Sequence, residues 1–324
     1  MPRYREALPQ LGKEIFLTDG GMETDLLFNQ GFDLPCFAAF DLLKSPDGRT
    51  ALRRYYERHM AIARRHDRGF ILEGVTWRAS PDWGDRLGYD EHTLAAANRD
   101  AVTMMGGVRD AFESNKPIVL SGCIGPRGDG YDPGAIMTKE EAEAYHSFQA
   151  DIFATTDADM ITAITITNSP EAIGIARAGA TARMPVVVSF TVETDGRLPT
   201  GQPLGEAIME VDFESTTPPA YYMVNCAHPT HFAHVLEEGG PWLSRLKGVR
   251  ANASTCSHAE LDEAETLDDG DPVALGFESI ALRQLAPGIT VLGGCCGTDH
   301  RHIEEIAKAA DGKQHRLFHR RIIC

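Results

Sequence analysis

The sequence predicts an α/β protein folded as a single-domain (β/α)₈ TIM barrel that spans residues 1–324. Short apolar runs alternate with longer helical patterns along the chain, and this alternation occurs eight times. A chain of 324 residues is long enough for one barrel of this type. The other candidate, a doubly wound open sheet, has less support because no GxGxxG motif follows the first apolar run.

Eight apolar runs are the expected strands. Several consist almost entirely of β-branched or aliphatic residues, as in PIVLSG, PVVVSF and ITVLGG. Continuous runs of this kind are typical of parallel strands that are buried on both faces. The expected strands cover residues 14–18, 70–75, 118–122, 160–165, 186–191, 221–225, 248–252 and 289–292.

Helical patterns fill most of the segments between these strands. Between residues 94 and 112, apolar side chains recur every three or four positions, which predicts one buried helix face. Ser169 followed by Pro170 is typical of a helix start, with Ser169 as the N-cap. After the last strand, Thr298 or Asp299 is expected to cap the final helix.

The composition limits the possible partners. The chain has 31 Lys and Arg against 47 Asp and Glu, which gives a formal charge of −16. An acidic surface argues against nucleic acid or an anionic membrane as the main partner, and small molecules are expected instead. The sequence shows neither a signal-peptide pattern nor a membrane-spanning apolar stretch, so a cytoplasmic location is expected. It does not indicate an oligomeric state.

Cysteine usage points to metal or thiol chemistry. An odd number of cysteines in a chain of this kind does not indicate a disulfide framework. No role is expected for the last one, Cys324, in a basic tail. The seven cysteines are Cys36, Cys123, Cys226, Cys256, Cys295, Cys296 and Cys324.

The strongest chemical signal is the GGCCGT segment that contains Cys295 and Cys296. It follows the last expected strand and precedes a helix, so it is expected at the carboxyl-terminal mouth of the barrel, where active sites of this fold lie. Adjacent side chains of a regular strand point to opposite faces. A glycine-rich turn releases this constraint and would let both sulfur atoms reach one ion.

Cys226 ends the sixth expected strand and should reach the same mouth. Three thiolates with one open position match a catalytic zinc site, whereas structural zinc usually has four protein ligands. His228 and His231 are close in sequence, but we do not expect them to bind the metal. Two alternatives remain: inert packing of the cysteines, and a non-enzymatic zinc-binding or redox-sensing protein that uses a Cys295–Cys296 disulfide.

A site of this kind favours alkyl transfer to sulfur. A free thiol has a pKa of about 8.5, and coordination to a metal deprotonates it. A substrate thiol in the open position would therefore be a nucleophilic thiolate at neutral pH. Three thiolate ligands make the metal a weak Lewis acid, which argues against activation of water for hydrolysis.

Over nearly its whole length, the chain resembles the homocysteine S-methyltransferase family. Asn225-Cys226 and the Gly293 to Gly297 segment match the two zinc motifs of that family, and the second motif is highly specific. Weaker similarities occur in the expected order elsewhere. They are LTDGGMETDL at 17–26, TWRAS at 76–80, SGCIGP at 121–126, and SFT at 189–191 with Gly201.

The resemblance implies transfer of a methyl group to homocysteine, giving methionine. Asp19 and Gly20 would help to bind the amino acid, and Asn225, next to Cys226 in the metal motif, is a further candidate for substrate binding. Cys226, Cys295 and Cys296 would hold Zn²⁺ and present the substrate sulfur. The methyl donors of the family are cationic compounds such as S-methylmethionine or betaine. Trp77, near the expected mouth, could hold such a donor through a cation–π contact.

The chain departs from the family pattern at two strand ends. Ile164 stands where the family has a glutamate that would hold the substrate ammonium, and Arg250-Ala251-Asn252 replaces a Tyr-Pro-Asn element. A lost charge-assisted contact is worth roughly 1.5–3 kcal/mol. Two hypotheses follow: the acceptor is a different thiol or selenol, or Glu73, at the end of the second strand, supplies the missing charge.

Overall fold

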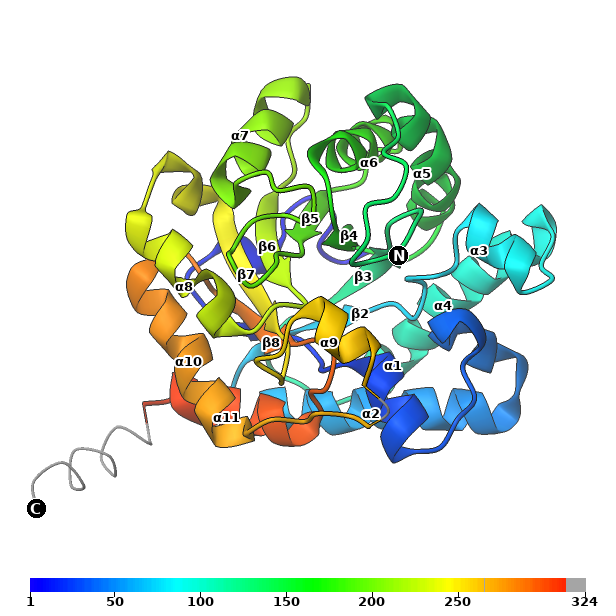
Figure 1. Cartoon of the computed structure of the whole chain (residues 1–324). Coiled ribbons are helices and arrows are strands. Elements are labelled where there is room, and N and C mark those ends of the chain that lie inside the picture. Colours follow the sequence, from blue (N-terminus) through cyan, green and yellow to red (C-terminus); the bar gives the residue numbers. More distant parts are fainter. Residues whose placement is uncertain (265, 313–324) are drawn as a thin grey trace, which may run out of the picture.

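The computed structural model, which describes residues 1–264 and 266–312, is a closed barrel of eight parallel strands (Figure 1). Each strand pairs with its neighbours in chain order, and β1 closes the barrel by pairing with β8. The predicted (β/α)₈ barrel is therefore confirmed. The strands are β1 Phe16–Leu17, β2 Gly69–Glu73, β3 Ile118–Ile124, β4 Met160–Ile166, β5 Val186–Phe190, β6 Tyr221–Asn225, β7 Leu246–Ala251 and β8 Val291–Gly294.

Helices form a ring around the strands (Figure 1). Shorter 3₁₀ or π-helical turns at 9–11, 25–29, 35–37, 39–44 and 241–245 complete the connections. No helix in the described part of the chain is both long and apolar enough to cross a membrane. The α-helices are α1 Met22–Thr24, α2 Pro46–Arg65, α3 Pro81–Arg86, α4 Glu91–Ala111, α5 Lys139–Ala154, α6 Ser169–Thr181, α7 Leu204–Glu214, α8 Pro229–Glu238, α9 His258–Asp262, α10 Pro272–Leu285 and α11 His300–Ala310.

Two details of the elements differ from the sequence expectations. The N-cap of α6 is Asn168, not Ser169, because the Asn168 side chain accepts a hydrogen bond from the Glu171 amide. The last strand runs two residues further than expected and ends at Gly294, since Gly293 and Gly294 pair with β7. At the final helix the expectation holds, and Asp299 is the cap. Cys324 lies outside the described residues.

The barrel interior has an apolar lower layer and a polar upper layer. One buried cluster joins inward side chains of seven strands, including Phe16, Val119 and Tyr221. Because side chains of a strand alternate between its faces, residues two positions further along point into the same interior, nearer the carboxyl ends. Many of these are polar and buried: Glu73, Ser121, Thr162, Ser189, Asn225 and Arg250. The polar layer forms the floor under the barrel mouth.

Candidate active site

A cavity of about 440 Å³ opens at the carboxyl ends of the strands. This volume lies within the range of roughly 300–1,000 Å³ that is usual for small-molecule sites. Its walls come from residues at or just after the ends of β1, β2, β3, β4, β6, β7 and β8. The site that the sequence predicts and the cavity of the fold therefore coincide in space.

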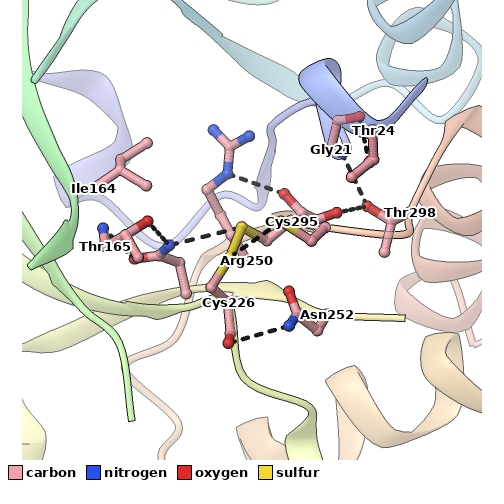
Figure 2. Close-up of a disulfide and its surroundings, with 12 residues drawn as sticks. Gly21, Thr24, Ile164, Thr165, Cys226, Arg250, Asn252, Cys295 and Thr298 are labelled. Carbon is pink, nitrogen blue, oxygen red and sulfur yellow. Dashed lines mark hydrogen bonds between the residues drawn. A yellow bond between two sulfur atoms is a disulfide. The ribbon is translucent and has the colours of Figure 1, made fainter. Parts of the chain in front are cut away.

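The three sulfur atoms of Cys226, Cys295 and Cys296 meet in this cavity, all within 4.8 Å of one another. Among the described residues, this is the only group of three or more potential metal-binding side chains that close together. Cys226 and Cys295 are joined as a disulfide, with their Cα atoms 5.3 Å apart (Figure 2). The Cys296 sulfur is free and lies 3.6 Å from that of Cys226. The redox-sensing alternative from the sequence predicts a disulfide between Cys295 and Cys296. This pairing is wrong, because the structure joins Cys295 to Cys226 and leaves Cys296 free.

Backbone contacts between neighbouring strands hold the cysteines in place. The Cys226 amide donates to the Arg250 carbonyl, and the Cys295 amide donates to the Ala251 carbonyl. Cys226 itself has a φ of +53°, a left-handed conformation that non-glycine residues rarely adopt. Such strain is typical of functional sites, where the surrounding structure fixes the conformation. Here it turns Cys226 out of β6 toward the turn after β8.

The first loop of the barrel supports the Cys295 turn directly. A Cβ atom on Gly21 would collide with the carbonyl oxygen of Cys295 and with the Thr24 hydroxyl. Thr298 also joins the two segments, since its carbonyl accepts from the Gly21 amide and its hydroxyl donates to the Cys295 carbonyl (Figure 2). Only glycine therefore fits at position 21 in this arrangement.

Two residues that the sequence analysis did not identify contact the cysteines. The Tyr131 hydroxyl lies 3.5 Å from the sulfur of Cys226 and 3.6 Å from that of Cys296, and can donate to either. Its ring stacks on His258 at a centroid distance of 4.0 Å. His258 in turn donates from Nε2 to the Cys226 carbonyl at 2.6 Å. Tyr131 lies in the loop after β3, and His258 is the first residue of α9, after β7. No local motif marks either residue.

Asn225 lies beside the sulfur cluster, but its amide is occupied by the chain. Its side-chain oxygen accepts from the Thr165 amide and the Ser189 hydroxyl. Its side-chain nitrogen donates to the Thr165 hydroxyl at 2.8 Å and faces the Cys295 sulfur at 3.7 Å. In this structure Asn225 positions β4 and Cys295.

Asp19 and Glu73 lie on the polar floor, and Arg250 joins them. Arg250 Nη2 donates to Asp19 Oδ1 at 2.7 Å and to the Gly20 carbonyl at 3.2 Å, and Nη1 lies 3.5 Å from Glu73 Oε2. Burial raises the pKa of Glu73 to about 7, although Arg250 opposes this shift. Burial disfavours the charge of Arg250, but the Asp19 and Glu73 carboxylates outweigh it and raise its pKa.

Trp77, in the segment after β2, and Ile164, in β4, line the same cavity. Trp77 Nε1 donates to the Ile164 carbonyl at 3.1 Å, which fixes the indole ring against β4. The Arg78 guanidinium lies over the Trp77 ring, 3.9 Å from its centroid. One face of this indole is therefore covered by a cation of the chain itself.

The cavity wall is acidic overall. Two arginines, Arg78 and Arg250, face six carboxylic side chains: Asp19, Glu23, Glu73, Asp129, Asp262 and Asp268. His228 and His231 do not join the sulfur cluster: His228 pairs with Glu278, and His231 contacts the Thr255 carbonyl. An excess of negative charge favours cationic ligands.

Known structures share this architecture. The chain is similar to the homocysteine methyltransferase MmuM from Escherichia coli in its metallated form, with 19% identity, 91% of this chain and 96% of that chain covered, and a TM-score of 0.70. The oxidised form of the same enzyme gives the same identity and coverage and a TM-score of 0.72. At this level of identity, the likeness shows the fold. A comparison with curated proteins finds no match.

The family itself is shown by sequence. The model of the homocysteine S-methyltransferase family matches residues 16–310, which cover most of the chain and the whole barrel. The match includes every residue that lines the cavity. The chain therefore belongs to the homocysteine S-methyltransferase family and is a methyltransferase.

Proposed function

We propose that this protein is a zinc-dependent S-methyltransferase that moves a methyl group from a cationic donor to homocysteine, giving methionine. The observation that carries the proposal is the position of Cys226, Cys295 and Cys296, whose sulfur atoms lie within 4.8 Å of one another at the barrel mouth. Three protein thiolates leave one of the four positions of a tetrahedral ion for a substrate.

The cysteine geometry fits zinc. Two thiolates bound tetrahedrally at about 2.3 Å from zinc lie roughly 3.8 Å apart, and the Cys226 and Cys296 sulfurs are separated by 3.6 Å. The disulfide of Cys226 with Cys295 must be reduced before all three can bind. When bound, zinc would hold the acceptor sulfur as a thiolate at neutral pH.

The proposed reaction is a direct displacement. The acceptor thiol loses its proton to solvent, and its sulfur forms a bond to the methyl carbon of the donor. The bond between that carbon and the donor sulfonium or ammonium centre breaks, and the electron pair stays on the donor, which becomes neutral. Tyr131 would donate a hydrogen bond to the cysteine sulfurs and hold them in place, and the loop carrying it would limit the access of water.

The acidic cavity supports a cationic donor of the S-methylmethionine or betaine type. Because Arg78 covers one face of the Trp77 ring, only the opposite face could meet the donor through a cation–π contact. Asp262 and Asp268 lie on the part of the cavity wall that follows β7, where they would attract a positively charged compound.

Ile164 is the residue that supports a second class of acceptor. This apolar residue lines the cavity where a carboxylate would otherwise meet a substrate ammonium. The alternative is a zinc-thiolate methyltransferase that acts on a thiol or selenol without an amino-acid head group. Glu73 and Asp19, on the neighbouring floor, support the amino acid instead.

The test is a labelled methyl-transfer assay with the reduced, zinc-loaded protein. Deuterated S-methylmethionine and betaine are each offered with homocysteine, and methionine is measured by mass spectrometry. We expect labelled methionine and about one zinc per chain, and Cys226→Ala should lose both. Cys256→Ala is the matched control, because Cys256 lies outside the sulfur cluster. Undiminished transfer by Cys226→Ala would contradict the proposal, and so would zinc-loaded protein that methylates no thiol.

A further inference from the structure

A buried group of three charges forms the floor of the cavity. Asp19, Glu73 and Arg250 come from the ends of β1, β2 and β7, and each is at most 5% exposed. Asp19 and Arg250 form a hydrogen-bonded ion pair at 2.7 Å, so their charges largely cancel. Glu73 lies on the other side of the guanidinium, with its Oε2 3.5 Å from Nη1.

Two atoms of this group have unused hydrogen-bonding capacity. Arg250 Nη1 and Glu73 Oε1 are both buried, and neither has a hydrogen-bond partner among the residues that the structure describes. Leaving a buried polar atom unpaired costs about 1–3 kcal/mol, and more for a charged group. A donor on Arg250 and an acceptor on Glu73 therefore lie next to each other in the wall of a cavity that is large enough for a ligand.

The rest of Arg250 is fixed by the chain. Its Nε donates to the Gly294 carbonyl at 3.1 Å, and its Nη2 donates to Asp19 Oδ1 and to the Gly20 carbonyl. Its own carbonyl accepts from the Cys226 amide. Arg250 therefore contacts the backbone next to both cysteine positions. These contacts hold its Nη1 atom, which has no hydrogen-bond partner among the described residues, at a fixed place relative to the sulfur cluster.

Three kinds of head group can be compared at this position. A carboxylate alone would satisfy Nη1, but it would also face the unneutralised charge of Glu73. An ammonium alone would satisfy Oε1 and leave Nη1 unpaired. A zwitterion supplies an acceptor for Nη1 and a donor for Oε1, and adds no net charge to the buried floor.

We infer that Arg250 and Glu73 form the head-group subsite for a zwitterionic α-amino acid, with the carboxylate on Arg250 Nη1 and the ammonium on Glu73 Oε1. The inference rests on the proposed function, in which the same ligand carries its sulfur to Cys226, Cys295 and Cys296. It also explains how an amino acid is recognised although the β4 wall offers the apolar Ile164 (Figure 2). The charge comes from β2 and β7 instead.

Binding of thioethers tests the subsite without any methyl transfer. L-Methionine is compared by titration calorimetry with 4-(methylsulfanyl)butanoate, which lacks the ammonium, and with 3-(methylsulfanyl)propylamine, which lacks the carboxylate. Charge-assisted hydrogen bonds of this kind predict that each deletion weakens binding at least about 10-fold. Equal affinity for all three compounds would overturn the inference.

Two variants assign the contacts to individual residues. Glu73→Gln should weaken methionine and the amine at least about 10-fold and leave the butanoate nearly unchanged. Arg250→Lys, which keeps the charge but loses the planar fork, should weaken methionine and the butanoate and leave the amine nearly unchanged. Glu23→Gln is the matched control. It removes a carboxylate from the same cavity, and none of the described ion pairs links Glu23 to Arg250, so the preference for methionine over the butanoate should persist. Equal weakening of all three ligands by Glu73→Gln would contradict the assignment.

The same series in the transfer assay separates the two claims. Homocysteine, 4-sulfanylbutanoate and 3-sulfanylpropylamine are offered to the reduced, zinc-loaded protein with a labelled donor. Transfer to all three with equal kcat/KM would leave the proposed methyltransferase intact and refute the subsite. Selective binding of methionine with no transfer to any thiol would support the subsite and refute the proposed function.

Discussion

The Tyr131 hydroxyl lies 3.6 Å from the Cys296 sulfur, although the two residues are 165 positions apart in the chain. The contact brings the loop after β3 over the turn after β8, and the same hydroxyl lies 3.5 Å from Cys226. A hydroxyl that donates to metal-binding sulfurs disperses their negative charge and fixes their orientation.

Tyr131→Phe should therefore weaken zinc binding while leaving the fold intact. Loss of a contact to metal ligands typically costs 10- to 100-fold in metal affinity or activity. The measurement is competition with a chromogenic chelator at fixed pH. Tyr89→Phe, which loses a hydroxyl bonded to Asp41 at a distance from the cysteines, is the control. Unchanged zinc affinity in Tyr131→Phe would show that the contact does not influence the metal.

The disulfide between Cys226 and Cys295 should make the proposed zinc binding dependent on reduction. A sulfur in a disulfide is not a thiolate, so the oxidised protein retains only Cys296 of the three ligands. We expect less than 0.1 zinc per chain without reductant and about one after treatment with a phosphine. Zinc content and intact mass are measured on the same sample. Stoichiometric zinc in protein that still contains the Cys226–Cys295 bond would contradict this expectation.

Gly21→Ala should disrupt the cysteine turn. The added Cβ atom would collide with the Cys295 carbonyl, and the backbone of the turn would have to move. We expect lower zinc affinity and a loss of about 1–3 kcal/mol in the free energy of unfolding. The control is Gly107→Ala in α4, where nothing lies within 4 Å of the new Cβ, and this change should stabilise the helix by about 0.5–1 kcal/mol. The idea fails if the two variants bind zinc equally well.

Glu73→Gln should make stability less dependent on pH. Burial raises the pKa of Glu73 in the folded protein from 4.5 to about 7, even with Arg250 beside it. As the pH rises through this window, the unfolded chain releases the proton first, so the folded state loses stability. The free energy of unfolding should fall by up to about 3 kcal/mol for this reason. Glutamine does not titrate, so the variant should lack this part of the pH dependence.

This prediction is checked by urea unfolding of the reduced, metal-free protein at pH 5 and pH 8. The variant should be more stable than the wild-type protein at pH 8, and the difference should shrink toward pH 5. Burial also raises the pKa of Glu23 to about 7. Both proteins should therefore still lose some stability as the pH rises, because both contain Glu23. A variant that is less stable at pH 8 than the wild-type protein would contradict the assigned pKa direction.

Strand positions were predictable because buried parallel strands need uninterrupted apolar runs. Six of the eight expected runs overlap a strand over most of their length, and β6 matches its expected range of 221–225. The weakest case is β1, where only Phe16 and Leu17 pair with neighbours. The two added residues of β8, Gly293 and Gly294, carry no apolar side chain and pair because β7 lies alongside them.

The floor of the site could not be read from local sequence. Asp19, Glu73 and Arg250 are separated by more than 50 positions from one another, and only the barrel register places their side chains together. Similarly, Leu261, Leu267 and Asp268 line the cavity, although no local motif in the acidic stretch at 260–271 marks them. Loop placement depends on tertiary contacts that leave no periodic pattern in the chain.

X-ray absorption at the zinc edge of the reduced, zinc-loaded protein tests the central claim most directly. We expect three sulfur neighbours at about 2.3 Å and one lighter atom, and a change to four sulfur neighbours when homocysteine is added. Fewer than three sulfur neighbours in the free protein would contradict the assignment of Cys226, Cys295 and Cys296 as the ligands. A spectrum that homocysteine does not change would contradict the proposed binding of the acceptor thiol at the metal.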